Sequence, residues 1–132
     1  MSNNLTVNHT IKLIKLQFPE FYLRSSELLD ETATKAMEME IAYGVVIADE
    51  KHFIVEFHLK LFNEKIKGQF KMAALFETDT VIDDEFKQSA LVQVNAPAIA
   101  FPYLRSFVST TTVNAGYNAV ILPSINLTSL KR

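Results

Sequence analysis

The chain has 132 residues, of which 48% are hydrophobic, and it contains three glycines, four prolines and no cysteine. This length and composition fit a single packed domain over residues 1–132 rather than a disordered segment. A formal charge of −2 with scattered basic residues argues against a nucleic-acid partner. The lack of cysteine excludes disulfides, and no apolar run reaches the roughly 18 residues of a membrane helix, so we expect a cytoplasmic protein without membrane insertion.

The first predicted strand covers residues 10–18. Its apolar residues change parity between Leu13 and Ile14, which indicates a bulge. Pro19 follows and has no N–H to donate to a ladder, so it favours a sheet edge or a strand break.

Three further segments alternate apolar and polar residues with the period of a half-buried strand. They cover residues 35–47, 53–61 and 66–76, and polar turns separate them at 48–51 and 63–65. We expect the first two to form a long hairpin. With residues 10–18 they make four antiparallel strands.

The rest of the chain predicts helices followed by an irregular return. Residues 83–85 are all acidic, which suits the first turn of a helix, and apolar residues follow at helical spacing until Pro97. A second helix is expected over residues 101–108, with Pro102 in its first turn. The apolar stretch 120–122 is too short to assign. The predicted fold class is therefore α+β, a four-stranded antiparallel sheet packed with C-terminal helices.

The width of this sheet predicts an oligomer. Four strands of ten residues present a face of about 19 by 34 Å, whereas a helix is only ~10–12 Å wide. One helix leaves much of the apolar face uncovered, and a large apolar patch in water is disfavoured. A second copy of the chain is the simplest cover.

Motifs for catalysis and for cofactors are missing. Three glycines cannot build a phosphate-binding loop or a dinucleotide fingerprint, so we expect no cofactor. His52, Glu56 and His58 share a strand face and would need one more ligand to hold a metal, but they suit a solvated face equally well. We expect no metal site.

Hydroxyl side chains gather at Ser106, Ser109 and residues 110–112. No Gly-x-Ser-x-Gly turn is present and no histidine is nearby in sequence, so helix-end capping explains these hydroxyls better than nucleophilic catalysis. Glu38 and Glu40 lie on one strand face, where solvation is the default. The sequence therefore does not predict an enzyme.

One segment resembles a known family. The stretch N-A-P-A-I-A-F-P-Y-L-R-S-F at residues 95–107, followed by Gly116 and by L-P-S-I-N-L at 122–127, resembles the C-terminal region of the SecB family of protein-export chaperones. Its most specific part is F-P-Y-x-R. The strands resemble the family more loosely, through Q-F-P at 17–19 and A-L-F at 74–76.

The resemblance implies a four-stranded antiparallel sheet packed with helices, assembled as a dimer or a dimer of dimers. It also implies an ATP-independent chaperone that holds unfolded polypeptides in an apolar groove, without a cofactor, and the family's role suggests protein export as the purpose. By position, it assigns substrate-binding roles in that groove to Met39, Ile41, Tyr43, Phe101, Tyr103, Leu122 and Ile125.

The sequence departs from the family at the surface that docks the translocation ATPase SecA. Export members resemble one another in carrying acidic residues there, and this chain has Lys15, Pro19 and Gln69 instead. The departure speaks against SecA docking by the usual surface. Two alternatives therefore stay open: a binding module dedicated to one client, such as the antitoxin of a toxin–antitoxin pair, and reuse of the fold with a small-molecule pocket between the sheet and the F-P-Y helix.

Overall fold

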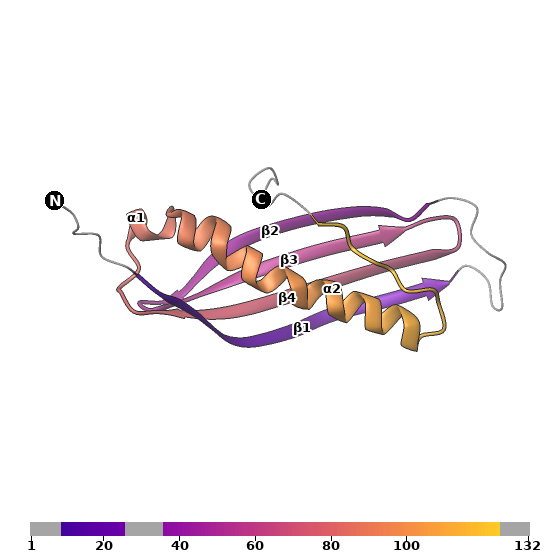
Figure 1. The fold of residues 1–132 in the computed structure, drawn as a ribbon, viewed down its shortest axis with the longest axis horizontal. Coiled ribbons are helices and arrows are strands. Elements are labelled where there is room, and N and C mark those ends of the chain that lie inside the picture. The colour runs from indigo at the N-terminus through magenta and orange to yellow at the C-terminus, as the bar shows by residue number, and fades with distance from the viewer. Residues whose placement is uncertain (1–8, 26–35, 125–132) are drawn as a thin grey trace.

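The computed structural model describes residues 9–25 and 36–124. They form one four-stranded antiparallel sheet with a long helix on one face (Figure 1). The strands are β1 (Ile11–Ser25), β2 (Glu38–Asp49), β3 (His52–Phe62) and β4 (Ile66–Thr78). Their spatial order is β1-β4-β3-β2, so β3 and β4 are central and β1 and β2 are edges. The predicted α+β class is confirmed.

The alternating pattern sets which residues share a face. Tyr43 of β2 pairs with Phe57 of β3, which in turn pairs with Met72 of β4. Because side chains alternate along a strand, every second residue of these three strands points toward the helix. The long hairpin of β2 and β3 is therefore formed as predicted.

Strand β1 is longer than the sequence pattern indicated. A register shift between Leu13 and Lys15 confirms the expected bulge, and a second shift lies between Gln17 and Glu20. Pro19 lies inside the second shift and on an edge strand, where a missing N–H is tolerated. The strand therefore continues to Ser25 instead of ending at the proline.

The helical region starts as predicted but divides differently. A short helix, α1 (Asp84–Lys87), begins at Asp83, whose carboxylate accepts a hydrogen bond from the Phe86 N–H at 2.7 Å. A π-helical turn, η1 (Leu91–Asn95), leads into one long helix, α2 (Ala96–Asn114). The expected break at Pro97 and the short second helix over 101–108 were wrong.

Two prolines explain this correction. Pro97 lies in the first turn of α2. Its missing N–H costs little there, because the N–H groups of a helix's first turn have no carbonyl acceptor within that helix. Pro102 lies inside α2, where a proline costs ~3 kcal/mol or more in an isolated helix. Phe101 and Leu104 beside it are buried, and the burial of this helix face outweighs that cost.

Helix α2 ends in a tight reversal at Gly116. The Tyr117 N–H donates to the Thr112 carbonyl and the Gly116 N–H to the Val113 carbonyl, both at 3.0 Å, which is the Schellman pattern. Gly116 has φ of 99°, a region that favours glycine. The chain then turns back beside α2, and we call residues 117–124 the return segment.

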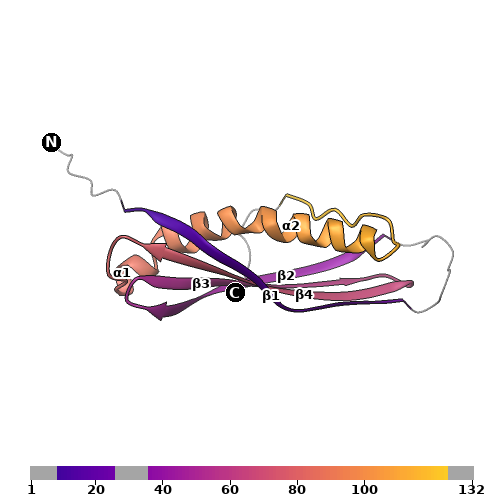
Figure 2. The ribbon, with the colours of Figure 1, turned by 90° about the horizontal axis from the view of Figure 1, so that it is seen from below.

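The molecule has two layers. Seen from the side, α2 and the return segment lie together on one face of the sheet (Figure 2). Seen from above, the return segment runs between α2 and β2 (Figure 1). The core lies between these layers, and we call the face of the sheet that turns away from α2 the outer face.

Within the described part of the chain, no helix is long and apolar enough to cross a membrane.

Candidate binding surface

The helix face of the sheet is covered unevenly. Central residues such as Phe57 and Phe70 are fully buried. Along the edge strand β2, the apolar residues on this face other than the buried Tyr43 are half-buried or exposed, and with Met37 just before the strand we call them the β2 margin: Met37, Met39, Ile41, Val45 and Ile47. The apolar face thus has a closed centre and an incompletely covered edge.

Helix α2 does not cover the centre alone. Val120 and Leu122 of the return segment are buried in the same core cluster, while Ile121 between them is 60% exposed. The return segment therefore widens the cover that one helix provides. A second copy of the chain is not needed at the centre of the sheet, contrary to the reasoning from helix width alone.

Three polar side chains of α2 hold the return segment. Arg105 Nε donates to the Leu122 carbonyl and Ser109 Oγ to the Val120 carbonyl, both at 2.9 Å. The Val120 N–H donates to Thr112 Oγ1 at 3.0 Å. The prediction that these hydroxyls cap a helix end was wrong for Ser109 and Thr112, which bind the return segment instead.

Tyr43 fastens the edge strand to the helical layer. Its ring packs against Phe57 with centroids 5.7 Å apart, and its hydroxyl donates to the Gln93 carbonyl at 3.0 Å. Gln93 lies in η1, where the π-helical turn departs from the regular α-helical hydrogen-bond pattern. Tyr43 is only 6% exposed, so in this state it supports the β2 margin from below.

The residues predicted to line a groove fall into three groups. Tyr43, Phe101 and Leu122 lie in one core cluster, where Phe101 also packs on Phe57 with centroids 5.9 Å apart. Met39 and Ile41 lie on the β2 margin. Tyr103 is 48% exposed and is absent from that cluster, and Ile125 lies outside the described residues.

A second apolar margin, along β1, was missed by sequence reasoning. Phe18 stacks on Phe107 of α2 with ring centroids 3.8 Å apart, and Phe21 meets Phe107 edge-on at 5.1 Å. Phe21 is nevertheless 48% exposed. The available signal is Phe18 and Phe21 on either side of Pro19 and Glu20, but a proline also predicts a strand break, which hides the continuation of the strand.

The solvent side of α2 carries no charge. Arg105 is the single charged residue of this helix, and it is half-buried against the return segment. The exposed positions are all uncharged: Ala98, Ile99, Pro102, Tyr103, Ser106, Thr110, Val113 and the terminal Asn114. A helix of 19 residues without an exposed charge is unusual for a surface in water.

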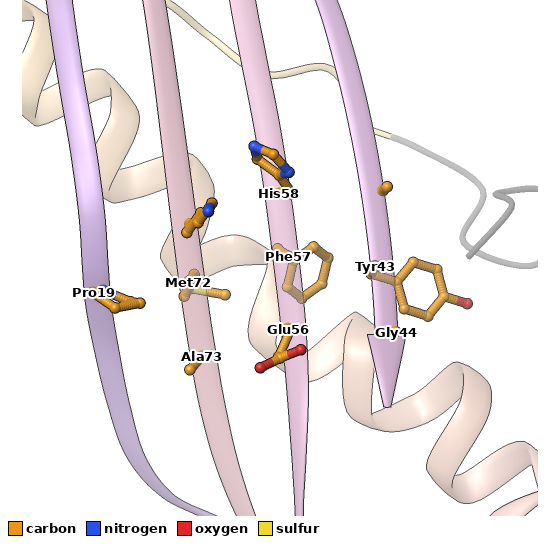
Figure 3. A pocket seen from close by; sticks show the side chains of 10 residues that line it. Pro19, Tyr43, Gly44, Glu56, Phe57, His58, Met72 and Ala73 are labelled. Carbon is orange, nitrogen blue, oxygen red and sulfur yellow. The ribbon is translucent and has the colours of Figure 1, made fainter. Parts of the chain in front are cut away.

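The outer face contains a hollow of about 470 Å³ (Figure 3). Its lining includes Ala42, Gly44 and Ala73, which are small, and Glu56 and His58 stand between them on β3. His58 Nε2 lies 2.8 Å from Gln69 Oε1. These residues form a solvated polar face rather than a catalytic pair.

The alternative of a metal site at His52, Glu56 and His58 gains no support from the structure of this face. His52 lies 2.8 Å from Asp49 and 3.4 Å from Glu77, while His58 faces Gln69. Over residues 9–25 and 36–124, no three ligating side chains gather into a group that could hold a metal ion.

The three residues that stand where the family resemblance implies acidic side chains are accessible to solvent. Lys15 and Pro19 are exposed and Gln69 is half-buried.

Comparison with known proteins gives one family. The sequence model of the family described as preprotein translocase subunit SecB matches residues 22–131. MJ0357, an uncharacterised protein of Methanocaldococcus jannaschii, is 42% identical over 55 residues, which are 42% of this chain. The match spans about a third of that relative's length (34%).

Two solved structures share the fold. The SecB-like chaperone Rv1957 of Mycobacterium tuberculosis, solved in complex with a peptide from the Rv1956 HigA1 antitoxin, superposes with a TM-score of 0.65 at 17% identity and covers 87% of both chains. A protein of unknown function from Streptococcus agalactiae has a TM-score of 0.56 at 11% identity, covering 89% of this chain and 100% of that one. At these identities the likeness concerns the fold.

Proposed function

Because the chain belongs to the SecB family, we propose that it is a chaperone and not an enzyme, and that it holds unfolded polypeptides along the β2 margin without using ATP. The observation that carries this proposal is the uneven cover of the helix face. Met39 and Ile41 offer accessible apolar surface that continues into a closed core. Methionine is flexible and polarisable, so such a surface can accept different apolar side chains.

A dedicated client is the second candidate. The fold neighbour Rv1957 is bound to an antitoxin peptide, and Lys15, Pro19 and Gln69 stand where export members would present acids to SecA. Both observations favour a chaperone that serves one partner over one that delivers many clients for export. In this case Met39 and Ile41 would contact a defined segment of that partner.

We also propose that the uncharged side of α2 is buried by a second copy of the chain. Ile99, Tyr103 and Val113 are exposed apolar residues on a helix without exposed charges. Packing two such helices together would bury these residues at no cost in desolvated charge. Tyr103 then belongs to the oligomer contact and not to the client groove. Sedimentation of the wild type and of Tyr103→Glu checks this, and a wild-type monomer at micromolar concentration would contradict it.

The client proposal is tested by holding activity. Chemically denatured malate dehydrogenase is diluted into buffer with equimolar chain, and aggregation is followed by light scattering. We expect the wild type to suppress aggregation and the double variant Met39→Gln/Ile41→Thr to lose most of that suppression, because polar side chains replace apolar contacts of similar size.

Val46→Thr is the matched control. Val46 is exposed on β2 but pairs with Ile54 on the outer face, so the same strand is altered without touching the margin. Equal loss in the control and in the double variant would overturn the margin as the site. If the wild type fails with denatured malate dehydrogenase but binds a partner encoded beside it, the dedicated-client candidate is the correct one.

A further inference from the structure

The return segment lies where an extended client would have to enter the core. We propose that residues 118–124 of this segment occupy the client's place in the free protein and are displaced when a client binds. This inference rests on the proposed function and adds to it a mode of recognition. It also explains how Tyr43 and Phe101, both buried here, can contact a client.

The return segment has the chemistry of an unfolded chain. Val120 and Leu122 point into the core and Ile121 points to solvent, which is the alternation of an extended apolar peptide. Residues 118–124 nevertheless belong to no helix or strand. The segment therefore packs on the sheet as a bound peptide does, through alternate side chains.

Its hydrogen bonds are local and come from side chains of α2. The carbonyls of Val120 and Leu122 accept from Ser109 and Arg105, and the Val120 N–H donates to Thr112. No backbone hydrogen bond joins residues 118–124 to the described strands. Losing these contacts leaves the strand ladders and α2 intact, so the segment can leave without unfolding the domain.

Gly116 supplies a fixed point for that movement. The Schellman bonds of Gly116 and Tyr117 close on α2 itself, whereas the contacts with the core and with the side chains of α2 begin at Val120. Residues 118–124 can therefore swing away while the helix end stays formed.

The same contacts define the client class. A client that replaces the segment needs two apolar residues at positions i and i+2, for the places of Val120 and Leu122. Ser109 and Arg105 then donate to the client's carbonyls at those two positions. Because carbonyls are common to all sequences, the donors accept many clients, and selection comes from the spacing of the apolar pair.

The Val120 amide is a direct reporter of displacement, because its hydrogen bond exists only when the segment is docked. Hydrogen exchange of the full-length chain is measured by NMR with and without a saturating extended peptide that carries two leucines at i and i+2. Binding of the peptide is measured separately by fluorescence anisotropy. We expect exchange at Val120 to accelerate by at least about tenfold on binding, the factor that corresponds to losing one hydrogen bond, while exchange at Phe57 is unchanged.

Variants sharpen this test. Leu122→Ala removes an apolar side chain that the segment buries in the core and that a client supplies for itself, so it should raise peptide affinity by at least about tenfold, and Val120→Ala should act in the same direction. Ile121→Ala is the matched control, because Ile121 belongs to the same segment but is 60% exposed. We expect no change in affinity for this control.

The outcomes separate two failures. If the peptide binds and Val120 exchange is unchanged or slower, or if Leu122→Ala leaves affinity unchanged, the displacement is wrong while the client proposal stands. If neither this peptide nor any denatured client binds, the proposed function itself fails.

Discussion

The centre and the edges of one sheet carry similar apolar patterns but have different surroundings. Strands β3 and β4 bury every residue of their helix face, whereas β1 and β2 leave Phe21 and the β2 margin partly in water. The difference comes from the strand order, since β3 and β4 each have a neighbouring strand on both sides, whereas β1 and β2 each have one on a single side. Stability should therefore depend on the centre, and binding on the edges.

The two edges also differ from each other. β1 carries Lys12 and Lys15, contains Pro19 and has two register shifts, all of which discourage pairing with another strand. β2 pairs with β3 without a shift from Glu38 to Ile47 and contains no proline. Of the two edges, β2 is therefore the more regular one, and it lies beside the β2 margin, which agrees with the proposed position of the client.

The largest expected effect separates the centre from the edge. Phe57→Ala removes a ring that is fully buried and packs on Tyr43 and Phe101, so we expect a loss of ~3–5 kcal/mol in the free energy of unfolding. Ile41→Ala on the β2 margin should cost only about 1–2 kcal/mol, because part of its surface is already in water. Urea denaturation measures both, and equal losses would contradict the division between centre and edge.

Two glycines give a smaller and sharper comparison. A Cβ at Gly68 of β4 would lie 2.8 Å from Leu23 Cδ2 and 3.2 Å from the Tyr22 carbonyl oxygen, so Gly68→Ala should push β1 away and cost about 1–3 kcal/mol. A Cβ at Gly44 of β2 meets nothing within 4 Å, and Gly44→Ala should stabilise the strand by about 0.5 kcal/mol. Thermal unfolding distinguishes the two signs, and a destabilised Gly44→Ala would show that the edge is packed more tightly than its exposure indicates.

The sheet could be predicted from sequence because its signal is local. Alternation along β2, β3 and β4 needs only neighbouring residues, and the parity change at Leu13 placed the bulge in β1. The helical region was less predictable, because Pro102 inside α2 is tolerated through burial against the sheet. That burial is a tertiary effect which no local pattern contains.

The binding surface was predictable only in part. The family resemblance predicts roles for Met39, Ile41 and Leu122. The structure places Met39 and Ile41 on the half-buried β2 margin, whereas Leu122 lies in the buried core. The roles of Ser109 and Thr112 depend on a segment that returns from ten or so residues later, so their hydroxyls looked like helix caps. The sequence alone shows that such residues can form hydrogen bonds, but it does not show which residues they bind.

The smallest expected effect concerns the turn between β2 and β3, which joins the edge to the centre. The Asp49 carboxylate accepts from the Lys51 N–H at 2.9 Å and lies 2.8 Å from His52 Nδ1, and these contacts, the first above all, lower the pKa of Asp49 below its ordinary value of 3.8. A lowered pKa in the folded state means that the ionised form stabilises the fold. This contribution is present above pH 3.8 and is lost as the pH falls through the lower, folded pKa.

Thermal unfolding between pH 2 and pH 5 should therefore show a slightly weaker acid dependence for Asp49→Asn than for the wild type. Glu50→Gln is the control on the same turn. A variant Asp49→Asn that follows the wild-type curve throughout would mean that the turn holds the edge strand through its backbone alone.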